Sequence, residues 1–241
     1  GAVSHMLLAA YGFMGFLAMG FSYVLVPMFA LAPVPSDKWA LGAVLFSCAG
    51  LVLGIAGVWI GQDGWAAAGG AVGLIGAILY LGLMVVALRQ RMRKRLGPAF
   101  MLMGLSWALL PLSLLAGIAW ALDLLPPWGA VMFGLLLFGW LLGFLLAILQ
   151  RIVPFLASMH AAIAVRRRPP TVTALTAPGP LAAHLYCHCA ALILLSAGII
   201  WPLPNLVSLG ALVGFLGAVS FAWFFLLAVM KYRAAVATPS A

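Results

Sequence analysis

Seven long runs of apolar residues constrain this chain more than any other feature of its sequence. A helix needs about 20 consecutive apolar residues to cross the hydrocarbon core of a bilayer. The runs are continuous and lack the period-two alternation of barrel strands, so they predict helices. The predicted fold class is therefore an all-α, polytopic transmembrane helical bundle with about seven spans. We place these spans at residues 3–31, 39–60, 65–88, 98–122, 128–151, 181–202 and 205–231.

The composition indicates that lipid is the surrounding solvent. Of the 241 residues, 67% are hydrophobic and only 6% are charged. A soluble domain of this length would carry about a quarter charged residues. The chain cannot cover its surface with enough polar side chains for water, which excludes a soluble globular domain.

The basic residues predict how the chain is oriented. The twelve Lys and Arg residues fall at span ends that, in a seven-span chain, all face one side. Asp63 and Asp123 lie in loops on the opposite side, which hold no Lys or Arg. Because cytoplasmic loops are enriched in Lys and Arg, we predict an outside N-terminus and an inside C-terminus in a bacterial inner membrane. The net charge of +9 is then a topology signal, and it does not predict a nucleic-acid partner.

The order of the runs predicts three segments. Residues 1–165 hold the first five spans, and we expect the fifth helix to bend near Pro154 and to continue along the inner membrane surface. Residues 166–180 are rich in Pro and polar side chains, which predicts a cytoplasmic linker. Residues 181–241 hold the last two spans and a short tail. Glycines recur at helical spacing in the second, third and seventh spans, which predicts close packing of helix backbones.

Acidic side chains are nearly absent from the predicted spans. The chain has no Glu, and its three Asp residues fall in predicted loops or at span ends. A proton-driven transporter normally needs an acid inside the membrane, so this class is disfavoured. The sequence also lacks a Gly-x-Ser-x-Gly motif, which argues against a hydrolase of that type. We therefore predict no catalytic residue, and an enzymatic role could be at most that of an oxidoreductase or a subunit of one.

Histidines are the remaining candidates for chemistry. His184 and His188 are four residues apart, so they share one face of a helix at the inner end of the sixth span. Neutral imidazole is a common ligand of transition metals and of haem iron. The pair could give one ligand to a haem, or two ligands to copper or zinc with His160 as a third. The alternative is that all three are interfacial side chains that hydrogen-bond to the backbone or to lipid.

Two further residues are candidates for binding a cofactor. His5 starts a stripe of small and Met side chains in the first span, which would suit a planar ring. Arg151 could pair with a haem propionate or a lipid phosphate through its planar guanidinium. Alternatively, Arg151 extends to the interface as long basic side chains often do.

Two stretches of the chain resemble a known group of membrane proteins. The first is His5-x5-Tyr-Gly-Phe, followed by Gly20-x2-Tyr-x-Leu-Val-Pro-Met-Phe; the second is Gln-Arg-Ile-Val-Pro-Phe-Leu from Gln150, followed by His160. Together they resemble membrane proteins related to haem-copper oxidase subunit I, in particular the NnrS-type nitric-oxide-response proteins. The resemblance covers about 50 residues and implies that the seven spans correspond to the C-terminal part of a twelve-helix protein. It also implies a b-type haem and a possible copper ion, with His5 at a metal site near the outer surface.

The chain departs from the oxidases in its histidine pattern. It lacks the adjacent His-His pair and the His-x-His pair that those enzymes carry near the outer side, so reduction of oxygen or nitric oxide is not predicted. We expect an inner-membrane protein of respiratory type that binds haem or a metal and serves in electron transfer or as a subunit of a redox complex. Its expected partners are the lipid bilayer, other membrane subunits and a quinone or cytochrome. The alternatives are a non-catalytic subunit or assembly factor and a permease for a small solute or metal.

Overall fold

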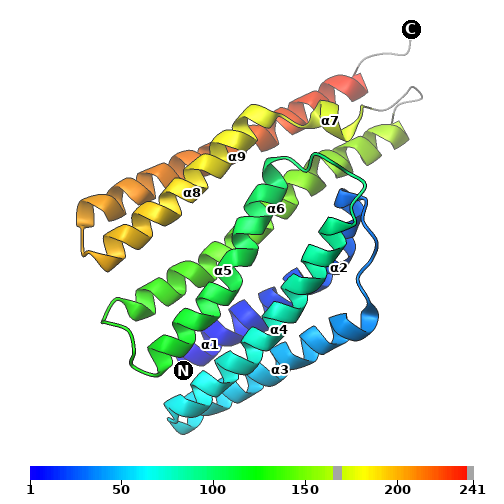
Figure 1. The fold of residues 1–241 in the computed structure, drawn as a ribbon. Helices are drawn as coiled ribbons and strands as arrows, with labels where there is room; N and C mark the ends of the chain where they lie inside the picture. The colour runs from blue at the N-terminus through cyan, green and yellow to red at the C-terminus, as the bar shows by residue number, and fades with distance from the viewer. Residues whose placement is uncertain (165–169, 238–241) are drawn as a thin grey trace. The chain divides into compact units, whose positions relative to one another are not determined.

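The structure, a computed structural model, describes residues 1–164 and 170–237, which form helices and no strand (Figure 1). The first run of apolar residues is one continuous helical segment, in which a π-helix separates two α-helices. The elements are α1 (Ala2–Leu7), η1 (Leu8–Met14), α2 (Gly15–Ala30), α3 (Asp37–Ile60), α4 (Asp63–Arg89), α5 (Pro98–Ala121), α6 (Gly129–Ala164), α7 (Val172–Leu175), α8 (Pro178–Ile200) and α9 (Pro204–Ala237).

The seven predicted spans are confirmed. Seven of the described helical segments are long and apolar enough to cross a bilayer. The first consists of α1, η1 and α2 together, and the others are α3, α4, α5, α6, α8 and α9. The chain is therefore an all-α, multi-pass membrane protein.

Helix α6 is longer than the span predicted for it. It has 36 residues and passes through Pro154 without a break. At 1.5 Å per residue it is about 54 Å long, well beyond the hydrocarbon thickness of about 30 Å. Spanning helices tolerate Pro where neighbouring groups satisfy the freed backbone carbonyl. The segment that we expected along the inner surface thus belongs to the same helix, up to Ala164.

The expected linker at residues 166–180 is partly described. Its residues 166–169 lie outside the described part of the chain. Thr171 caps the short helix α7, because its hydroxyl accepts a hydrogen bond from the backbone N–H of Ala174 at 3.2 Å. Helix α8 already begins at Pro178, and Pro at the first position of a helix costs nothing because that N–H would be unpaired. The C-terminal part of this segment is therefore helical.

The described chain divides into two compact units. Unit 1 contains residues 1–96 and 103–145, and unit 2 contains residues 97–102 and 146–241. The units divide within α5 and within α6, whereas the expected linker at 166–180 falls inside unit 2.

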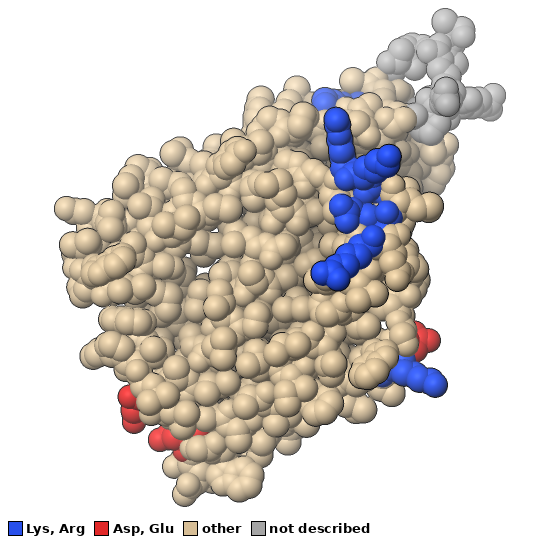
Figure 2. Space-filling model, in the orientation of Figure 1, with Lys and Arg blue, Asp and Glu red and all other residues tan. Residues whose placement is uncertain are grey.

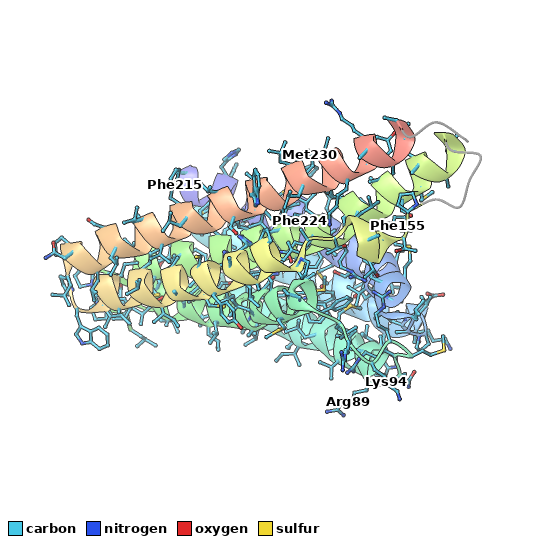
Figure 3. All side chains as sticks on the ribbon, turned by 90° about the horizontal axis from the view of Figure 1, so that it is seen from above. Arg89, Lys94, Phe155, Phe215, Phe224 and Met230 are labelled. Carbon is cyan, nitrogen blue, oxygen red and sulfur yellow. The ribbon has the colours of Figure 1, made fainter. Side chains whose placement is uncertain are left out.

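Contacts at the two ends of unit 1 join the helix ends that the predicted topology places on the same side of the membrane. At one end, the backbone N–H of Met92 donates to Leu31 O at 3.0 Å, which joins the end of α2 to the basic segment after α4. At the other end, the indole N–H of Trp59 donates to the hydroxyl of Ser4 at 2.9 Å, which joins the end of α3 to the N-terminus. Arg89 and Lys94 lie together at the basic end (Figure 3). Most of the face seen in Figure 2 carries no charge, as a lipid-exposed surface requires.

Glycines allow α3 and α4 to pack with their backbones in contact. A Cβ atom added at Gly50 or Gly57 of α3, or at Gly69 of α4, would overlap backbone atoms of the facing helix. Gly61 ends α3 with a φ of 67°, a left-handed conformation that favours glycine, and α4 starts two residues later. The predicted role of the glycines in close helix packing is thus confirmed for this pair of helices.

Unit 2 is built around a second close pair, α8 and α9, which lie side by side along their lengths (Figure 3). Phe224 of α9 is fully buried and packs with Leu181 and Ala177. Phe215 and Met230, on the same helix, lie on the side away from α8 and are exposed. The amine of Lys231 donates to Ala174 O at 3.0 Å, so the basic end of α9 meets the segment before α8.

Candidate functional site

His184 and His188 lie next to each other in α8, as their spacing predicted. Their ring centroids are 5.7 Å apart, and the ring planes are tilted by 43°. His184 is buried, and its Nδ1 lies 3.0 Å from the carbonyl oxygen of Gly217 in α9. A carbonyl oxygen can only accept a hydrogen bond, so Nδ1 carries the proton and Nε2 holds a lone pair.

The Nε2 atoms of both histidines are buried and have no hydrogen-bond partner among the described residues. Leaving a buried polar atom unpaired costs about 1–3 kcal/mol, so each such atom calls for an explanation. Here both unpaired Nε2 atoms belong to histidines, which lie on successive turns of α8. This arrangement is the main chemical feature of unit 2.

The α8–α9 contact holds the pair in place. A Cβ atom added at Gly217 would lie 3.0 Å from the Cβ of Cys187, a tight contact, so glycine favours the close approach of the acceptor carbonyl to α8. The ring of Phe221 lies 5.4 Å from that of His184, and Phe224 packs beside it at 5.9 Å. The imidazoles therefore sit in a helix interface with aromatic side chains on the α9 side.

This geometry is typical of histidines that bind a metal. Metal-binding histidines commonly donate one ring N–H to a backbone carbonyl, which fixes the tautomer and aims the other nitrogen at the ion. Two histidines at positions i and i+4 of a helix can bind the same ion. They cannot bind opposite faces of one haem, because both project from the same side of the helix. The pair therefore offers two ligands to an ion or one axial ligand to a haem.

His160, which was predicted as a third metal ligand, lies on the surface of α6. His160 in α6 is exposed, and its Nδ1–H donates to Leu156 O of its own helix at 3.0 Å. Among the residues that the structure describes, no three His, Cys, Asp or Glu side chains are grouped so that they could hold a metal ion. His160 is thus not brought to His184 and His188 as a third ligand.

His5 and Arg151 lie in different units, and each has its own local surroundings. His5 is exposed near the start of α1, and the buried residue beside it is Ser4. Arg151 in α6 is half-buried, with its guanidinium carbon 5.8 Å from the ring centroid of Phe100. This distance is typical of a cation–π contact.

Sequence reasoning missed two features of unit 2. Gln150 in α6 is fully buried, and neither atom of its amide group has a hydrogen-bond partner among the described residues. Its signal in the sequence was that it is a polar amide within an apolar run, just before Arg151. The second is Gly217, whose carbonyl orients His184; no sequence pattern reveals a backbone acceptor on another helix.

The chain was compared with protein-family models, with curated proteins and with solved structures, and none of these comparisons gives a match. The resemblance to the haem-copper oxidase group therefore rests on the sequence motifs alone.

Proposed function

We propose that this multi-pass membrane protein binds a transition metal, as a single ion or as haem iron, through His184 and His188. The observation that carries this proposal is the pair of buried, unpartnered Nε2 atoms, one of them on a ring fixed by a carbonyl. A neutral imidazole nitrogen that is free of hydrogen bonds is a good ligand for copper, zinc or iron.

The residues fit an ion more directly than a haem. Both imidazoles could bind one ion together, whereas only one of them could bind the iron of a b-type haem. The Nδ1–H bond to Gly217 fixes the ring of His184, and the ring of Phe221 lies beside it on the α9 side. A redox-active metal at this position would supply one-electron transfer within the membrane.

Electron transfer in a respiratory-type complex is the role that we propose for such a site. The sequence resemblance to the haem-copper oxidase group and the absence of Glu from the chain both favour it over proton-driven transport. Within this proposal, the protein lies in a bacterial inner membrane with its C-terminus inside. A quinone or a cytochrome exchanges electrons with it, and other membrane subunits cover part of its apolar surface.

Metal analysis and a reduced-minus-oxidised visible spectrum of the purified protein test the proposal together. We expect about one copper or iron atom per chain, with a Soret band only if the iron is in haem. Zinc has no redox chemistry, so a zinc ion would support metal binding but would refute the role in electron transfer. His184→Asn keeps an amide donor near the position of Nδ1 but removes Nε2, so it should fold and lose the metal. His188→Ala should lower the metal content as well.

His160→Ala is the matched control, because His160 is exposed and bonded to its own helix. It should keep the metal content of the unmodified protein. A protein that holds no metal after loading with copper, zinc or haem would refute the proposal. Such a result would favour a non-catalytic subunit or assembly factor.

A further inference from the structure

Unit 1 contains a cavity that none of the histidines lines. Its volume is about 130 Å³. An apolar cavity of about 150 Å³ in a soluble protein is large enough to take up benzene, so a space of this size fits one six-membered ring. The cavity is lined by residues of α1, η1, α2, α3, α4, α5 and α6, all within unit 1.

Flat aromatic rings form part of the cavity wall. The ring of Tyr11 stacks on Trp140, with centroids 5.8 Å apart and planes 22° apart, and on Phe133 at 6.5 Å and 23°. Trp120 stacks on Phe133 in turn, at 5.8 Å and 26°. All four side chains line the cavity. Aromatic rings prefer offset-stacked or edge-to-face partners, so this wall favours a flat, aromatic ligand.

Glycines form another part of the cavity wall, and at two of them an added Cβ atom would fit without a clash. A Cβ atom added at Gly73 would meet only the side chain of Leu114, at 3.8 Å, and one added at Gly54 would meet its nearest neighbours at 3.8 and 3.9 Å. Both distances are ordinary van der Waals contacts. These two glycines therefore differ from Gly50 and Gly69, whose added Cβ atoms would overlap the facing backbone.

The polar side-chain groups of the lining residues are the hydroxyls of Tyr11 and Ser47 and the indole N–H groups of Trp120 and Trp140. The hydroxyl of Tyr11 pairs with that of Ser113 at 2.8 Å. The hydroxyl of Ser47 has a long contact of 4.0 Å with the sulfur of Met19, which is a weak acceptor. No Asp, Glu, Lys, Arg or His is among the lining residues. Burying a charge without a partner is costly, so a charged ligand is excluded, whereas a neutral oxygen could bond to either hydroxyl.

The π-helix η1 explains how Tyr11 reaches the cavity. Lining residues occur at every fourth position along the first span, at Val3, Leu7, Tyr11, Gly15 and Met19. In a regular α-helix of 3.6 residues per turn, such a series drifts by about 40° at each step and leaves the cavity. The wider π turns at Leu8–Met14 oppose this drift. π-helical turns inside α-helices are rare and are frequent at functional sites.

We propose that this cavity binds a neutral, single-ring aromatic molecule that carries one hydroxyl or carbonyl oxygen, for which phenol is the simplest probe. The ring lies against the wall of Tyr11, Trp140 and Phe133, and the oxygen bonds to the hydroxyl of Tyr11 or Ser47. The proposal rests on unit 1 alone and does not depend on the histidine pair in unit 2.

Binding of phenol to the full chain in detergent, followed by quenching of tryptophan fluorescence, tests the proposal. Trp120 and Trp140 line the cavity and serve as reporters. We expect saturable quenching by phenol, weaker saturable binding of benzene and none of benzoate. Tyr11→Phe removes one hydroxyl and should raise the Kd for phenol about fivefold, as one net hydrogen bond predicts, while benzene binding stays unchanged.

Gly73→Ala and Gly73→Val fill the cavity and should raise the Kd for phenol in that order. Gly104→Ala is the matched control: this glycine lies in α5, is exposed, and has nothing within 4 Å of an added Cβ. It should leave the Kd unchanged and so separates cavity binding from partition into the micelle. Quenching that does not saturate, or that is the same in Gly73→Val and Gly104→Ala, would overturn the proposal.

Discussion

Alanine at Gly50 and alanine at Gly73 should change stability in opposite directions, although the two glycines face each other across α3 and α4. In a helix interior, Gly→Ala normally stabilises by up to about 1 kcal/mol. At Gly73 nothing opposes that gain, because the added Cβ would lie 3.8 Å from a single side-chain atom. At Gly50 the added Cβ would overlap the backbone N of Gly73 and would lie 2.7 Å from Gly69 O and from Gly73 Cα.

The size of the effect at Gly50 follows from these distances. Ordinary van der Waals contact begins at 3.4 Å, so the helices must separate by several tenths of an ångström along their closest line of contact. Backbone atoms cannot rotate away as a flexible side chain does. Inserting one methyl group into a close-packed interface typically costs about 1–3 kcal/mol, and in lipid the packing of helix backbones is a main source of association energy. We therefore expect Gly50→Ala to destabilise by about 1–3 kcal/mol.

Thermal or denaturant unfolding in a fixed detergent measures both variants against the unmodified chain. Gly50→Ala should unfold at a lower temperature, and Gly73→Ala at the same or a higher one. Equal stability of the two variants would refute the close backbone contact between α3 and α4.

Three further predictions concern packing, hydrogen bonding and topology. Phe224→Ala should lower the free energy of unfolding by about 3 kcal/mol, because the ring is fully buried. The side chain of Phe215, on the same helix, is 65% exposed, so Phe215→Ala should change the free energy of unfolding by less than about 1 kcal/mol. Denaturant unfolding measures both. Tyr80→Phe removes a hydroxyl that accepts an indole N–H at 3.0 Å and pairs with a serine hydroxyl at 2.7 Å, so the same assay should show a loss of about 1–3 kcal/mol. For topology, Gln62→Cys should react with a membrane-impermeant thiol reagent added to intact cells and Lys94→Cys should not; the reverse pattern would invert the predicted orientation.

The number and nature of the helices could be predicted from the sequence because lipid leaves few alternatives. Every backbone group inside a bilayer must bond internally, so a long apolar run has to be helical. The glycine stripes predicted close helix contact, and Gly50, Gly57 and Gly69 confirm it. The sequence predicted that the fifth helix continues past Pro154, and α6 does so up to Ala164. How the carbonyl freed by Pro154 is satisfied depends on neighbouring groups, which a local pattern does not show.

The candidate site could be predicted only where it depends on spacing within one helix. The spacing of four positions from His184 to His188 predicts a shared helix face, and the two rings are adjacent. The bond from His184 to Gly217 joins two helices, and local patterns carry no such information. His5 shows where a pattern within one helix misleads. The stripe predicted to start at His5 assumes regular α-helical spacing, and η1 breaks that spacing between Leu8 and Met14. Near the start of this span the cavity is lined by Val3 and Leu7, and not by His5.

The metal and haem content of the purified full chain, measured beside that of His184→Asn, tests the proposed function most directly. We predict about one transition-metal atom per chain in the unmodified protein and a loss of most of it in the variant, with the same unfolding temperature before metal loading. Equal metal content in the two proteins, or none in either after loading, would contradict the assignment of His184 and His188 as ligands.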